Sequence, residues 1–190
     1  MANDTNTTTG RTHDDEAGGV KHTLNKAVDA AGGMVGQASA STTSKAPDFA
    51  EAAAISDMYE IESSRIALDR TQNPTVREAA QKMIDDHTDS SAKLETAVRQ
   101  SPKAESSDVP NALDKRREKM IDHLREAPSE EFDRTYLGQQ VMAHEEAAKL
   151  MHNYRDEGDC QVLRGFATEV SPVIEGHLDH MKRLETNMPR

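Results

Sequence analysis

The sequence is poor in the residues that build disulfides, sheets and membrane spans. Its 190 residues include one cysteine, no tryptophan and only 3% aromatic side chains. A single cysteine, Cys160, rules out an intramolecular disulfide and a cysteine-rich metal site. No run of about eighteen apolar residues occurs, so no transmembrane helix is predicted. The abundant Ala, Leu, Met and Glu favour helices over strands and predict an all-α protein.

Basic charge is also scarce. The chain carries 23 Lys and Arg against 34 Asp and Glu, a net charge of −11. This balance argues against nucleic-acid binding, because phosphates require a basic face, and against electrostatic docking on anionic lipid. The N-terminus lacks the basic start and apolar core of a signal peptide. The sequence therefore predicts a cytoplasmic protein, or a periplasmic one whose leader has been removed.

Residues 1–46 differ in composition from the rest of the chain. They are rich in Thr, Ser, Gly and Ala, with too few large apolar side chains to hold a fold alone. We therefore expect a flexible low-complexity tail. A weak helical period between Val20 and Ala31 leaves a transient amphipathic helix as the alternative, for a partner or a membrane surface. The folded domain is predicted to cover residues 47–190.

Helix start and stop signals divide this domain. Asp48 followed by Glu51 fits a capping box, and Asn73 before Pro74 fits an N-cap with proline at the first helical position. The predicted helices cover about residues 48–71, 74–100, 108–125, 130–156 and 160–185. Two tight turns give antiparallel pairs, and a crossover of roughly thirty residues joins the pairs. This pattern predicts a ferritin-like four-helix bundle with an extra short crossover helix.

Each of the four long helices carries an ionisable residue within its apolar stripe. These residues are Glu60 or Glu62, then His87, His144 and His177. An unpartnered polar group in a core costs roughly several kcal/mol, so the four are expected to satisfy one another or to bind a metal. Counted from the tight turns at about 1.5 Å per residue, Glu60 lies closer to the level of His87 than Glu62 does.

These residue types suit a divalent metal. Imidazole and carboxylate are ligands for Fe, Zn or Mn, so the predicted metal ligands are Glu60, Glu62, His87, His144 and His177. The Glu-x-x-His signature of diiron proteins is absent, which leaves a nitrogen-rich mononuclear site or a structural hydrogen-bond cluster. No Ser-His-Asp spacing, phosphate loop or dinucleotide fingerprint is present, so no catalytic residue is predicted and an enzyme is disfavoured.

Of the other five histidines, His13, His22, His123 and His152 are expected in the tail or on the surface, and His180 is a candidate for the exterior of the last helix. Pro172 falls inside the last predicted helix, where it removes an N–H donor. It either opens space beside His177 or marks a tolerated bend at the surface.

Several motifs together resemble a known family. They are EIESSRIAL at 60–68, NPTVR at 73–77, MIDDH at 83–87, FDRTYL at 132–137, VMAHE at 141–145, and Pro172 with His177-Leu178. In this order they resemble a bacterial family of ferritin-like domains of unknown function, sometimes labelled predicted outer-membrane proteins. The resemblance covers about residues 48–186.

This resemblance implies a ferritin-like bundle without naming a reaction. The leading hypothesis is a metal-binding bundle protein, and a role in stress physiology is implied by the family analogy alone. The alternative is a non-catalytic structural or interaction protein whose buried polar cluster fixes helix register. A metal ion is the expected partner, and a protein partner or a homo-oligomer is left open.

Overall fold

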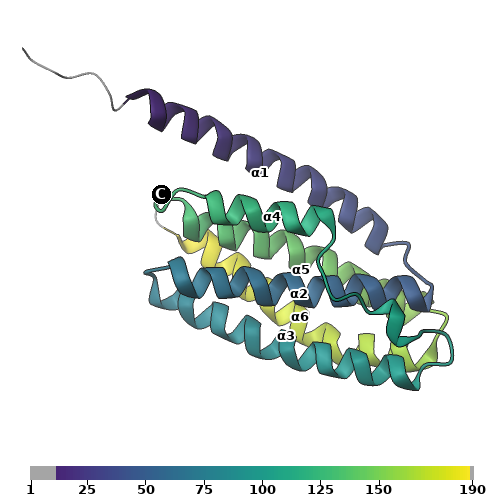
Figure 1. Cartoon of the computed structure of the whole chain (residues 1–190). Coiled ribbons are helices and arrows are strands. Elements are labelled where there is room, and N and C mark those ends of the chain that lie inside the picture. The colour runs from purple at the N-terminus through teal and green to yellow at the C-terminus, as the bar shows by residue number, and fades with distance from the viewer. Residues whose placement is uncertain (1–11, 189–190) are drawn as a thin grey trace, which may run out of the picture.

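The computed structural model describes residues 12–188 (Figure 1). Side chains are described from residue 19 onward. The elements in chain order are α1 (Thr12–Ala40), α2 (Ala46–Arg70), α3 (Pro74–Gln100), the 3-10 turn η1 (Ser106–Asp108), α4 (Lys115–Glu126), α5 (Phe132–Glu157) and α6 (Gln161–Asn187). The described residues contain no strand, so the prediction of an all-α protein is confirmed. None of the described helices has the length and apolar character needed to cross a membrane.

Four long helices surround the core. Helices α2 and α3 form one hairpin, and α5 and α6 form the other. Contacts of α3 with α6 and of α2 with α5 bring the hairpins together (Figure 1). Helix α4, within the crossover, packs on α2, and α1 lies along α5 and α4. The predicted hairpins are therefore present, and the crossover helix begins at Lys115 rather than near residue 108.

The start of α2 differs from the predicted capping box. Asp48 lies within the first turn rather than before it, because the helix begins at Ala46. The amide of Ala46 instead donates a 2.9 Å hydrogen bond to Asp159, which precedes α6. The cap is thus supplied by the opposite hairpin, a tertiary contact that local spacing cannot indicate. At α3 the prediction is confirmed, since the Asn73 side chain accepts from the amides of Thr75 and Val76.

The core has a polar layer between two apolar layers. At one end, Phe49 stacks on Tyr154 with ring centroids 3.9 Å apart. At the other end, Met83, Phe132 and Met181 belong to a second buried cluster. On α3, α5 and α6 one histidine lies between the residues of the two clusters. Apolar packing above and below therefore holds this histidine layer away from solvent.

Residues 12–40 form helix α1, within the segment 1–46 for which we expected a flexible low-complexity tail. Its anchor is Asp29, which is 4% exposed. One Asp29 oxygen lies 2.7 Å from Nδ1 of His123, and the other accepts a 2.8 Å hydrogen bond from Gln139. This pairing also corrects the expectation that His123 lies on the surface. Residues 1–11 lie outside the described part of the chain.

Candidate metal centre

Three histidines from three helices converge at mid-height. His87 comes from α3, His144 from α5 and His177 from α6, and every pair of rings has its centroids 5.5 Å apart. One nitrogen of each ring lies within 4.8 Å of the other two. The side chains are buried, with exposed fractions of 3%, 0% and 4%. The structure therefore brings together the three histidines that the helical stripes had singled out.

Each imidazole uses one nitrogen for a hydrogen bond to the protein. The pairs are His87 Nδ1 with Asp57 at 2.7 Å, His144 Nδ1 with the Gln140 carbonyl at 2.9 Å, and His177 Nε2 with Asp86 at 2.7 Å. A histidine that donates from one nitrogen to a carboxylate or carbonyl presents the other as a lone pair, the usual arrangement of metal-bound histidines. The three contacts thus fix the orientation of each ring, and a neutral ring that donates through its paired nitrogen leaves the other nitrogen free to bind a metal.

The second nitrogen of each ring has no hydrogen-bond partner. Nε2 of His87, Nε2 of His144 and Nδ1 of His177 are all buried and unpartnered. A buried polar atom without a partner costs about 1–3 kcal/mol, and three of them lie in one small volume. The arrangement has the character of a ligand set rather than of a self-satisfied hydrogen-bond network.

Two of the three rings have pKa values that keep them unprotonated, as metal binding requires. Burial lowers the pKa of His144 to about 3, and burial together with the neighbouring His144 lowers the pKa of His177 to about 4. Both are therefore neutral at pH 7. Burial alone would lower the pKa of His87, but the hydrogen bond and charge of Asp57 outweigh it and raise the pKa.

The structure separates the two candidate glutamates of α2. Glu60 is 1% exposed, and neither of its carboxylate oxygens has a hydrogen-bond partner. Its Oε1 lies 3.6 Å from Nδ1 of His144, and burial raises its pKa. Glu62 instead lies near the surface in a 2.7 Å ion pair with Arg125. Glu60 borders the histidine cluster and Glu62 does not.

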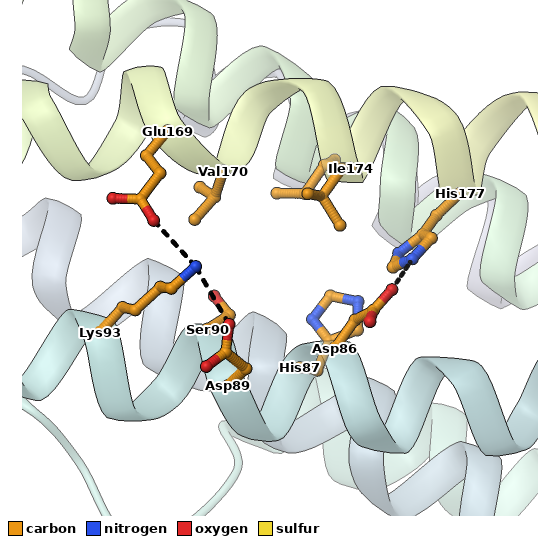
Figure 2. Close-up of a pocket in the computed structure, with 10 residues that line it drawn as sticks. Asp86, His87, Asp89, Ser90, Lys93, Glu169, Val170, Ile174 and His177 are labelled. Atoms are coloured by element: carbon orange, nitrogen blue, oxygen red, sulfur yellow. Dashed lines mark hydrogen bonds and ion pairs between the residues drawn. The ribbon is translucent and has the colours of Figure 1, made fainter.

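Two supporting carboxylates were missed in the sequence. Asp57 precedes Glu60 by three residues and so shares its helix face, a signal that was available but weak beside the neighbouring apolar stripe. Asp86 directly precedes His87 in the sequence and lies outside the apolar stripe, so the stripe gives no sign of its role. Its side chain is 28% exposed and contacts Lys82 at 2.7 Å. It also contacts His177 at 2.7 Å (Figure 2).

The donor set fits a single transition-metal ion. Three imidazole nitrogens with a carboxylate nearby match the ligands that Zn and Fe accept, at nitrogen–metal distances of about 2.0–2.1 Å. The four carboxylates typical of diiron sites are not gathered here, since the group of side chains that could share one ion consists of the three histidines, with Glu60 beside His144. The arrangement therefore offers three nitrogen ligands to one ion.

Comparison with known proteins supports the fold and names the family. The crystal structure of a DUF305 fragment from Deinococcus radiodurans is similar, with a TM-score of 0.63 at 15% identity, over 75% of this chain and 95% of that one. At this identity the likeness shows a shared fold. No curated protein matches the chain. A family model for a domain of unknown function matches residues 33–184, most of the chain, and the protein therefore belongs to the DUF4142 family.

Proposed function

We propose that this protein binds one divalent transition-metal ion through His87, His144 and His177. Glu60 completes the site as a neighbouring carboxylate, and the four long helices that carry these residues form a ferritin-like bundle. The observation that carries the proposal is the set of three buried imidazole nitrogens without partners. Asp57 and Asp86 hold the rings so that these nitrogens face a common volume.

Energetics favour a ligand over an empty polar layer. A purely structural cluster stabilises a fold when its donors and acceptors pair with one another, and a half-satisfied buried network is worse than an apolar core. Here the ring nitrogens that point outward from the cluster are paired, and those that point inward are not. A metal ion would satisfy the three inward nitrogens at once.

The chemistry favours Zn or Fe over a hard cation. Neutral imidazole suits Zn, Fe, Ni and Cu, whereas Mg and Ca prefer oxygen. The Glu60 carboxylate contributes negative charge, which offsets part of the ion's charge in the buried site. With one such carboxylate, the site suits one ion better than the two of diiron proteins.

Metal titration of chain purified without a histidine tag tests the proposal. After EDTA treatment and buffer exchange, equilibrium dialysis with Zn²⁺, Fe²⁺ or Mn²⁺ should give about one tightly bound ion per chain by elemental analysis. The double variant His87→Ala/His144→Ala should lose that ion while keeping its helical circular dichroism. The surface variant His152→Ala is the control, because the His152 side chain is 41% exposed and pairs with Glu175, and it should retain the ion. Wild-type protein without a tightly bound equivalent would leave the structural hydrogen-bond cluster as the better interpretation.

A further inference from the structure

A pocket between α3 and α6 opens directly beside two of the histidines. His87 and His177 line its inner end, and Val170 and Ile174 form part of its wall (Figure 2). Its volume of about 70 Å³ exceeds the ~10–15 Å³ that one water molecule needs. The pocket therefore has room for a cation that keeps part of its hydration shell.

A wider groove of about 570 Å³ adjoins this pocket along the same helix seam. The two share Asp86, Val173 and His177. The groove is open at Gly176, where a Cβ atom would have no heavy atom within 4 Å. Val173 is 46% exposed and lies where the two hollows meet. A continuous path thus leads from the surface to His177.

Acidic side chains dominate the mouth of the pocket. Asp86, Asp89 and Glu169 line it together with one lysine, Lys93. The Lys93 ammonium is held between Asp89 at 3.0 Å and Glu169 at 2.8 Å (Figure 2). Lys82, which lines the adjoining groove, pairs with Asp86 at 2.7 Å. The three carboxylates therefore exceed the two ammonium groups by one charge, and a cleft with an excess of negative charge concentrates cations.

The inner end of the path meets unpartnered ligand atoms. Nε2 of His87 and Nδ1 of His177 are buried and without hydrogen bonds, and both side chains line the pocket. Asp86 spans the two regions, since it is partly exposed and also contacts His177. The surface pockets beside α1 and at Phe166 contain none of the three histidines.

We propose that the pocket between α3 and α6 is the entry route by which a divalent cation reaches the histidine cluster. The carboxylates of Asp86, Asp89 and Glu169 attract the hydrated ion, and Asp86 guides it to His177. Val173 borders the opening. This inference rests on the proposed metal binding, but it concerns the rate of loading rather than the final affinity.

Closing the opening tests the route. Val173→Trp adds bulk at an exposed position and should slow Co²⁺ uptake by metal-free protein on the order of tenfold in stopped-flow absorbance. The amount of Co²⁺ bound at equilibrium should stay the same. Val162→Trp is the matched control, because Val162 lies on the same helix beside a separate pocket, and it should load at the wild-type rate.

A second pair of variants tests the charges. Asp89→Asn/Glu169→Gln should slow uptake about two- to tenfold at low ionic strength, and the difference should shrink near 1 M salt. Glu95→Gln/Asp156→Asn removes two exposed carboxylates that pair with Arg99 and Arg155 away from the pocket. This control should load like wild type at every salt concentration.

The outcomes separate the route from the metal site. Wild-type loading rates in both Val173→Trp and Asp89→Asn/Glu169→Gln, with normal final occupancy, would overturn the route and leave the metal site intact. Val173→Ala widens the opening without adding bulk, so loading slower than wild type by this variant would also contradict the route. Wild-type protein that binds no Co²⁺ at equilibrium would contradict the metal site and the route together.

Discussion

Oδ1 of Asp57 lies 2.7 Å from Nδ1 of His87, so a carboxylate on α2 orients a histidine on α3. The contact joins the two helices of one hairpin inside the core, where both side chains are buried. It also leaves Nε2 of His87 as the nitrogen that faces the cluster. Asp57 therefore acts on metal binding through His87 rather than as a ligand.

We expect Asp57→Asn to weaken metal binding about 10- to 100-fold, the usual effect of removing a partner that orients a metal-bound histidine. The amide can still accept a hydrogen bond but lacks the charge that supports the ring. Competition with a chelating dye measures the change in dissociation constant. Asp85→Asn is the control, since Asp85 is exposed and bonds Gln81 on the outer face of α3. Equal affinities for the two variants would contradict the role of Asp57.

Glu60 should affect stability and metal binding in opposite directions. Its carboxylate is buried without a hydrogen-bond partner, and burial raises its pKa. Glu60→Gln removes this charge and should raise the unfolding free energy of the metal-free protein by about 1 kcal/mol or more. The same change should lower metal affinity. Urea melts in EDTA and metal titrations measure the two effects.

Glu62→Gln is the matched control for this prediction. Glu62 lies two residues along the same helix in an exposed ion pair with Arg125. Such pairs contribute about 0–1 kcal/mol, so this variant should change neither quantity by much. A Glu60→Gln protein less stable than wild type without metal would show that Glu60 has a structural role.

Acid should destabilise the metal-free protein through two of its histidines. The pKa of His144 is lowered to about 3 and that of His177 to about 4 by burial, from an ordinary value of 6.5. Between about pH 6.5 and 4 the unfolded chain therefore binds protons that the folded protein does not. Stability falls as pH drops through this window, by about 1.4 kcal/mol per pH unit for each group.

His87 contributes with the opposite sign. Its raised pKa stabilises the fold below pH 6.5, and this contribution is lost as pH rises through the folded value. Urea melts from pH 4 to 8 in EDTA should therefore show a decline on the acidic side. His144→Gln should make that decline shallower, and an unchanged slope would show that His144 is not a source of it.

Asp29 should tie α1 to the rest of the protein. Asp29→Ala leaves buried His123 and Gln139 without their carboxylate partner, which should cost about 1–3 kcal/mol of unfolding free energy. Limited proteolysis should also cut α1 faster. Asp122→Ala is the control, because Asp122 is exposed on α4 and pairs only loosely with Arg125 at 3.6 Å. Melting curves that coincide for the two variants would show that α1 contributes little to stability.

The positions of the three histidines could be read from the sequence because each lies in a regular stripe of apolar residues. On α3 the stripe runs through Met83, His87 and Leu94, and helical periodicity alone places these side chains on one face. Counting along the helices also indicated that the stripes meet at similar heights. The choice between Glu60 and Glu62 needed the packed structure, since both lie close to the inner face of α2.

The role of α1 could not be predicted in this way. Its large apolar residues, including Leu24 and Met34, are exposed, and its inner face is polar or small. Gly33 packs against Met142, where a Cβ atom would come within 3.5 Å. A helix that packs on a core is recognised in a sequence by regularly spaced apolar residues on one face. Helix α1 is held by Asp29 instead and lacks this spacing. The buried partner, His123, is distant in sequence and identifiable only in the fold.

The three histidines come from both hairpins, so a bound metal would couple the unfolding of one hairpin to that of the other. His87 belongs to the α2–α3 hairpin, and His144 and His177 belong to the α5–α6 hairpin. An ion bound by all three would act as a cross-link that closes the whole crossover into a loop, and its binding free energy would add to the cost of parting the hairpins. When metal is added, the protection of backbone amides against hydrogen exchange should then increase together in α3, α5 and α6. Helix α1, outside the cross-link, should keep the exchange rates that it has in EDTA.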